Sequence, residues 1–239
     1  MSSRVPGPWI PGRAAPAHGI ITDQGSAANY TLGPLLSAQS SLNSFVEDLA
    51  TQLAGHGFER GEDGRVFRRS SPRGDVLIVE VQLSDHSSRR EKAFYINIGL
   101  VLAPEWEWNR QRTGRPASEL PRHYDGGWRR RLRSSGLSGD DQWRIADEES
   151  AAQVSARVRQ QLGDLMPQLL SLLDRDVVLN QTPDILGPGT WLTRAWILAG
   201  EGCIDELERL LFVDRPARTH DSVPVRMVWS YATGRACSA

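Results

Sequence analysis

Cysteine is scarce in this chain: only Cys203 and Cys237 occur among its 239 residues. Two cysteines are too few for a disulfide-rich secreted scaffold, or for a structural zinc site built mainly from cysteine. No apolar run approaches the roughly 20 residues that cross a bilayer, and the N-terminus lacks the continuous apolar stretch of a signal peptide. We therefore expect a reduced, cytoplasmic protein with no membrane association.

An excess of one charge is also missing. The chain has 28 basic and 29 acidic residues, a net charge of −1, so no global attraction to nucleic acid or to an anionic membrane follows. Lys92 is the only lysine, and such a preference for arginine is typical of GC-rich bacterial genomes. Tryptophan, in contrast, is abundant with eight copies, and it more often fills cores or anchors interfaces than catalyses reactions.

The apolar pattern divides the chain into four parts. Residues 1–38 are rich in proline, glycine, alanine and serine and predict a flexible leader. Residues 39–175 form the main domain, and residues 176–213 predict an appended helical hairpin. Residues 214–239 read as a tail, in which Val225–Tyr231 could add an edge strand.

Within the main domain, helical periodicity predicts a first helix over residues 41–54, capped by Ser40 or Ser41. Two strands follow, over 75–84 and 93–102, and their alternation gives one fully apolar face and one mixed face. Residues 127–133 and 142–145 are candidates for further strands.

A second long helix is predicted to start at Ser150, where Gln153 completes a capping box, and to end near Leu173. Pro167 should kink or split this helix. We expect an α+β fold: an antiparallel sheet of four to five strands with the two long helices on one face, plus the C-terminal helical hairpin.

A set of short motifs occurs in a fixed order within the main domain. They are Gly57-Phe58, Val66-Phe67-Arg68-Arg69, Glu80-Val81-Gln82, Phe94-Tyr95-Ile96-Asn97-Ile98-Gly99, His123-Tyr124, Arg131-Leu132, Trp143 and Pro167. Over about residues 40–175 the chain thereby resembles an uncharacterised bacterial family, domain of unknown function 4304. The resemblance implies a small α/β fold with an antiparallel sheet. It implies no established activity, and so no catalytic residue, metal or cofactor.

One alternative is a metal-dependent nuclease or other hydrolase that uses Asp75, Glu80, Gln82 or His123. Such enzymes need carboxylates that converge on a divalent metal. Asp75 and Glu80 stand five positions apart on one predicted strand, so they should point to opposite faces. We expect Glu80 and Gln82 to hydrogen-bond across the sheet to Tyr95 and Asn97 instead, with no catalytic site.

Residues 110–133 contain eight arginines but only two acidic residues, with aromatic residues interleaved. Such a segment can be a solvated loop, a protein interface or a nucleic-acid contact. We expect a non-enzymatic interaction module, of a regulatory or immunity type, with a protein partner; non-catalytic nucleic-acid binding is a second alternative. The contact residues we expect are Glu80, Gln82, Tyr95, Asn97, Trp106, Trp108, Arg129, Arg130 and Arg131.

Overall fold

The computed structural model describes residues 33–134, 141–181, 183–214 and 221–236. Most of the predicted leader, residues 1–32, lies outside the described residues. The other six residues of the predicted leader, 33–38, belong to the first helix, α1 (Gly33–Ala54).

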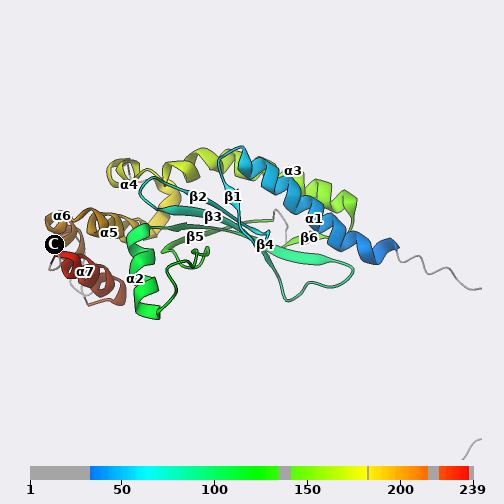
Figure 1. The fold of residues 1–239 in the computed structure, drawn as a ribbon. Helices are drawn as coiled ribbons and strands as arrows, with labels where there is room; N and C mark the ends of the chain where they lie inside the picture. Colours follow the sequence, from blue (N-terminus) through cyan, green and yellow to red (C-terminus); the bar gives the residue numbers. More distant parts are fainter. Residues whose placement is uncertain (1–32, 135–140, 182, 215–220, 237–239) are drawn as a thin grey trace, which may run out of the picture. The chain divides into compact units, whose positions relative to one another are not determined.

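A single antiparallel sheet forms the centre of the described region (Figure 1). Its strands are β1 (Glu59–Arg60), β2 (Val66–Ser70), β3 (Val76–Leu83), β4 (Lys92–Val101), β5 (Trp128–Leu132) and β6 (Trp143–Ile145). The first four pair in sequence order, and β5 and β6 both pair with β4. The two candidate segments, 127–133 and 142–145, therefore each contain a strand. The predicted α+β class is confirmed.

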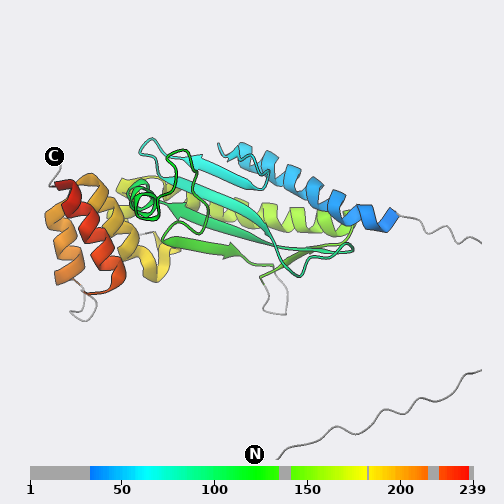
Figure 2. The same ribbon diagram turned by 60° about the horizontal axis from the view of Figure 1, so that its bottom comes forward.

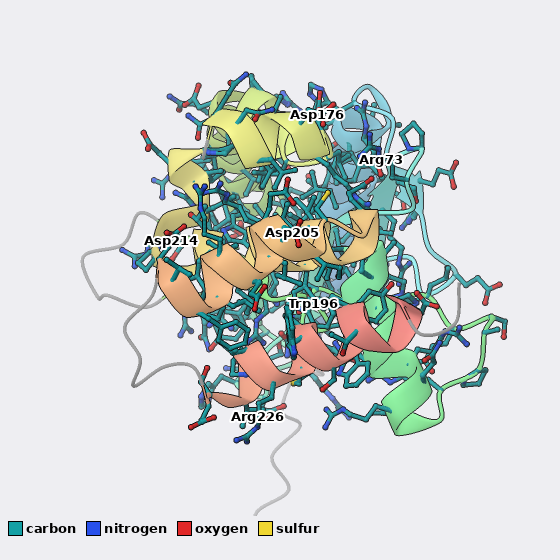
Figure 3. The ribbon with its side chains drawn as sticks, turned by 90° about the vertical axis from the view of Figure 1, so that its left-hand side faces the viewer. Arg73, Asp176, Trp196, Asp205, Asp214 and Arg226 are labelled. Carbon is teal, nitrogen blue, oxygen red and sulfur yellow. The ribbon has the colours of Figure 1, made fainter. Side chains whose placement is uncertain are left out.

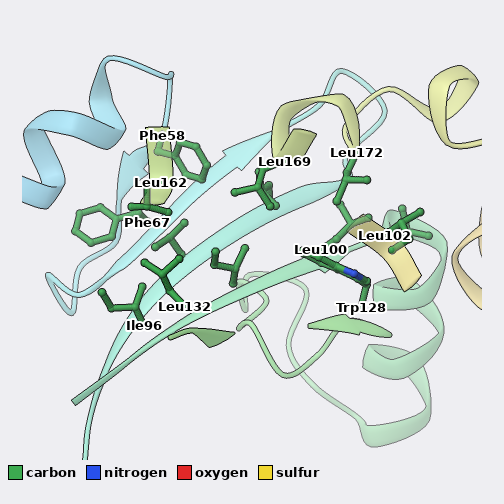
Figure 4. Packing of buried hydrophobic residues seen from close by; sticks show 14 of the residues in the cluster. Phe58, Phe67, Ile96, Leu100, Leu102, Trp128, Leu132, Leu162, Leu169 and Leu172 are labelled. Atoms are coloured by element: carbon green, nitrogen blue, oxygen red, sulfur yellow. The ribbon is translucent and has the colours of Figure 1, made fainter. Parts of the chain in front are cut away.

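Two long helices, α1 and α3 (Glu148–Ser171), lie on the same face of the sheet, as predicted (Figure 2). The apolar side of the sheet meets them, because Leu77, Val79 and Val81 of β3 are buried in the main core. Figure 4 shows this layer, with side chains from β4 beneath Leu162 and Leu169 of α3.

The first helix begins earlier than predicted, at Gly33 rather than near residue 41. Its buried stripe extends back by one turn, since Ala38 is as fully buried as Leu42. Ser41 is also buried, at 2% exposure, and lies inside the helix. The predicted start at Ser40 or Ser41 was therefore wrong, because serine is common at helix starts but is also tolerated inside a helix.

The second long helix differs from its prediction at its start and at Pro167. Its N-cap is Asp147, whose side chain accepts a hydrogen bond from the backbone of Ser150 at 2.8 Å, so Ser150 is the third helical residue rather than the cap. These hydrogen bonds from Ser150 lower the pKa of Asp147. The helix is not split at Pro167, since Leu162, Met166 and Leu169 are buried on both sides of it and hold both halves against the sheet.

A helix that the sequence reading missed, α2 (Ala103–Thr113), follows β4 directly. It begins with Pro104 in its first turn and ends at Gly114, which adopts a left-handed conformation with φ of 66°. Proline near the start and glycine just after the end are the usual boundary signals of a helix. They were obscured by the arginine-rich composition around them.

The rest of the described chain is helical. It comprises α4 (Arg175–Gln181), the 3-10 turn Asp184–Gly189, α5 (Thr190–Glu201), α6 (Ile204–Glu208) with a π-helical continuation Arg209–Val213, and α7 (Val223–Ala236). The predicted hairpin corresponds to α5 and α6. The prediction of an edge strand or tail at Val225–Tyr231 was wrong, because these residues belong to α7. Figure 3 shows Trp196 of α5 between α6 and α7, and its ring meets that of Tyr231 edge-on at 5.6 Å.

None of the helices in the described ranges has the length and apolar character needed to cross a membrane.

Candidate functional site

The sheet face that α1 and α3 leave uncovered has an apolar end and a polar end. At the apolar end, Val66, Ile78 and Val101 form a small buried cluster, against which Trp106 of α2 packs. The polar end consists of Glu80, Gln82, Tyr95, Asn97 and Arg131, and we call it the polar face. The strand register brings these residues together, because Glu80 lies opposite Asn97, Asn97 opposite Arg131, and Gln82 opposite Tyr95.

The loop between α2 and β5, residues 114–127, lies against this side of the sheet. A Cβ atom on Gly99 would be only 2.5 Å from the carbonyl oxygen of His123, so only glycine allows the loop to approach so closely. Arginines hold the loop in place: Arg68 Nε donates to the carbonyl of Pro121 at 3.0 Å, and Arg115 pairs with Asp125 at 2.8 Å. The side chains of Arg68 and Arg115 are therefore engaged in contacts within the molecule.

The pKa values of the two arginines shift in opposite directions. The hydrogen bond to Asp125 raises the pKa of Arg115. Burial lowers the pKa of Arg68, although Asp63 opposes the effect. Both side chains remain cations at physiological pH, since arginine titrates far above it.

Glu80 turns toward the loop rather than across the sheet. Its Oε2 lies 2.7 Å from Nδ1 of His123, and its Oε1 accepts from Arg122 at 3.2 Å. Arg122 also pairs with Asp63 at 2.7 Å. The prediction that Glu80 hydrogen-bonds to Tyr95 or Asn97 was therefore wrong, because Arg122 and His123 of the loop occupy both oxygens of its carboxylate.

The remaining members of the polar face bind one another. Asn97 Nδ2 donates to Gln82 Oε1 at 2.8 Å, as predicted, and Arg131 Nε donates to Asn97 Oδ1 at 3.0 Å. The Arg131 guanidinium stacks 4.0 Å from the centre of the Tyr95 ring. The hydroxyl of Tyr95 accepts from Gln142 at 2.6 Å. Arg131 is exposed, so the face presents a cation whose position is fixed from two sides.

The other two predicted arginines, Arg129 and Arg130, are exposed on the same strand as Arg131. Neither forms an ion pair or a side-chain hydrogen bond with the part of the chain that the structure describes. Arg129 lies close enough to the buried Glu105 to favour its charged form. The strand β5 therefore carries three successive exposed cations.

The two predicted tryptophans are turned toward the interior. Trp106 packs on the apolar end of the sheet face, with the guanidinium of Arg115 5.3 Å from its ring. Trp108, two residues further along α2, packs on the main core and meets the ring of Tyr231 edge-on at 6.4 Å. Both are partly buried packing residues, and neither belongs to the polar face.

Asp75 and Glu80, the carboxylates of the nuclease alternative, have separate partners. Asp75 is fully buried and accepts from Nε and Nη2 of Arg175, both at 2.7 Å, and from the backbone N–H of Ala103 at 2.9 Å. Arg175 begins α4, whereas the partners of Glu80 belong to the loop on the opposite face. Across the described ranges, no group of three or more histidine, cysteine, aspartate or glutamate side chains is arranged to hold a metal ion.

The sequence reading missed three side chains of this surface: Arg122, Gln142 and, as the partner of Glu80, His123. His123 belongs to the motif His123-Tyr124 and to the hydrolase alternative, but no local pattern pairs it with Glu80 or singles out Arg122 and Gln142. The polar side chains of Asn97 and Tyr95 do indicate that each has a hydrogen-bonding partner nearby. The structure supplies Arg131 of β5 for Asn97, and Gln142, just before β6, for Tyr95.

A protein-family model matches residues 49–175, more than half of the chain, and is described as domain of unknown function (DUF4304). The chain belongs to the DUF4304 family. The match covers only the C-terminal end of α1, from residue 49, together with the whole sheet, α2 and α3. Every residue of the polar face therefore lies within it, and α5–α7 lie outside it. No curated protein and no solved structure matches the chain.

Proposed function

We propose that this DUF4304 protein is a non-enzymatic interaction module, which binds an acidic protein partner through the polar face and the arginines of β5. The observation that carries the proposal is the arrangement of the polar face itself. Both oxygens of its carboxylate are bound, by Arg122 and by His123, and its outward cation, Arg131, is held by Asn97 and Tyr95.

This arrangement favours binding because the cations are already fixed before a partner arrives. An arginine that is stacked and hydrogen-bonded loses little side-chain entropy when it meets a carboxylate. Arginine and tyrosine are also among the residue types that contribute most to protein interfaces. A catalytic reading has less support, since both oxygens of Glu80 are engaged and the described residues around it contain no serine, cysteine or second free carboxylate in contact with His123.

The cellular role we propose is that of a regulatory or immunity-type partner protein in the cytoplasm of a bacterium. The low cysteine content fits a reducing compartment, and Cys203 is a free thiol. The arginine-rich composition fits a bacterial source.

The test is affinity capture of partners from a native lysate of the source organism, with the full-length chain as bait. The critical bait is Arg131→Glu, which reverses the fixed cation, and the matched control is Arg90→Glu, an exposed arginine between β3 and β4. We expect a stoichiometric protein that wild type and Arg90→Glu retain and Arg131→Glu loses. Absence of a stoichiometric partner, or equal retention by all three baits, would refute the proposal.

A second candidate is non-catalytic binding of nucleic acid, favoured by the three successive exposed arginines of β5. It predicts affinity for single-stranded DNA or RNA that falls steeply as salt rises, and falls further when Arg129 and Arg130 are replaced by glutamine. Binding that is absent or independent of salt would remove this candidate.

A further inference from the structure

The strand β5 is an edge of the sheet. It pairs with β4 on one side, and none of the described strands pairs with it on the other (Figure 2). An edge strand leaves the N–H and C=O groups of alternate residues without ladder partners, and these groups can receive another extended chain.

A groove of about 740 Å³ runs between this edge and α3. Most of the residues that line the groove are polar or charged. They are Arg130, Arg131, Leu132 and Arg133 on the strand side, Gln161, Asp164 and Leu165 on the helix side, and Asp141 before β6. The groove therefore has room for side chains beside the free edge of β5, in addition to the backbone groups of the edge itself.

The two sides of β5 differ in chemistry. Arg129 and Arg131 point to the uncovered face, because they lie opposite Gly99 and Asn97, while Trp128 and Leu132 point to the core. Alternation places Arg130 on the core side, where it is nevertheless exposed in the groove. Leu165 and Asp164 line the same groove from α3.

We propose that an extended segment of the partner adds to β5 as a further strand, with acidic residues at alternate positions and apolar residues between them. The acidic side chains would face Arg129 and Arg131, and the apolar ones would enter the groove against Leu165, because the side chain of Leu132 is buried in the core. This inference rests on the proposed function and specifies how the partner binds.

Charge determines which occupant fits. A second copy of the chain that paired through the same strand would bring three arginines against three arginines, and like charges placed opposite each other destabilise a strand pair. An acidic segment reverses this repulsion. Charge repulsion at this edge therefore opposes self-association and favours a strand of the opposite charge.

The experiment uses the full chain and a fluorescently labelled peptide of alternating valine and glutamate. Two further peptides carry N-methyl groups on either the odd or the even residues. In a strand pair only alternate residues donate to the neighbouring strand. We expect the plain peptide to bind, one methylated peptide to bind as well as the plain one, and the other to lose binding.

The protein variants test the charge. Arg131→Glu should weaken the plain peptide by about tenfold or more, and Arg90→Glu should leave it unchanged. A valine–lysine peptide should not bind. Amide hydrogen exchange should slow in β5 when the plain peptide is added, and thermal unfolding of each variant shows that it is folded.

Three outcomes would overturn the inference. If both methylated peptides bind as well as the plain one, the contact is electrostatic without strand pairing. If exchange slows elsewhere and not in β5, the segment binds another surface. If the peptide does not bind while lysate capture still depends on Arg131, strand addition fails and the proposed function stands; if the capture fails as well, both fail.

Discussion

Arg175 and Asp75, a hundred positions apart, face each other inside the molecule as a two-pronged ion pair. The Asp75 carboxylate is fully buried and the Arg175 side chain is 6% exposed. The same arginine contacts Glu201 at the end of α5, which Arg73 also reaches at 2.8 Å. The hydrogen bond from Arg175 lowers the pKa of Glu201. This cluster connects the start of β3 to α2, α4 and α5.

The first prediction concerns this ion pair. Arg175→Met should destabilise the chain by about 3–5 kcal/mol, because it leaves the Asp75 carboxylate buried without a counter-charge. The double variant Asp75→Asn, Arg175→Met should recover part of this loss, since the buried charge is gone while the side chain can still accept from Ala103. Urea unfolding measures all three free energies. A loss below about 1 kcal/mol for the single variant would contradict the argument.

A pair of glycines provides the second prediction. Gly99→Ala would place a methyl group 2.5 Å from the His123 carbonyl, so the loop must lift from β4. We expect a loss of about 1–3 kcal/mol in the free energy of unfolding. The control is Gly163→Ala in α3, which is exposed and has no atom within 4 Å of the added methyl. It should stabilise the chain by about 0.5–1 kcal/mol. Equal effects of the two substitutions would refute the close packing of the loop.

Much of the fold could be predicted from sequence because the signals are local. Alternation over β3 and β4 reports which side chains meet the helices, and the positions of Leu77, Val79 and Val81 follow it. The helix ends were harder to place. Ser41 and Ser150 are good capping residues by type, yet the actual boundaries depend on the burial of Ala38 and on the hydrogen bonds of Asp147.

The polar face could be predicted only in part. The partners of Gln82 and Asn97 follow from strand pairing, which alternation suggests. The partners of Glu80 do not, because His123 and Arg122 arrive from a loop more than forty residues away. The positions of Trp106 and Trp108 depend on α2 and α7, two helices that were not predicted from the sequence. Local pattern therefore identified the strands, and tertiary contacts selected the partners.

The third prediction tests the assignment of α7. Val228 is fully buried, whereas Arg226 is exposed and is labelled on the outer side of the helix in Figure 3. Val228→Asp should cost at least about 3 kcal/mol, because it buries an unpaired charge. Arg226→Asp, with the same new side chain, should change the free energy of unfolding by less than about 0.5 kcal/mol. If residues 223–236 contributed little to the fold, both variants would unfold at the same urea concentration as the wild type.

The last prediction concerns Glu105, in the first turn of α2. Its side chain is 8% exposed and its Oε2 accepts from the backbone N–H of Gly127 at 3.0 Å. Burial raises the pKa of this carboxyl to about 7, although the hydrogen bond from Gly127 and the charge of Arg129 oppose the rise. The folded protein therefore binds this proton more tightly than the unfolded chain, in which the pKa is near its ordinary value.

The sign of the pH dependence follows from this difference. The stabilisation that the protonated carboxyl provides is complete below about pH 4.5 and is lost as the pH rises toward and past 7, which amounts to roughly 3 kcal/mol. Glu105→Gln removes this titration, and its amide oxygen can still accept from Gly127. The variant should therefore gain stability relative to wild type between pH 5 and pH 8, with urea unfolding at each pH as the measurement. A difference that stays constant across this range would show that Glu105 is already ionised in the folded protein at pH 5.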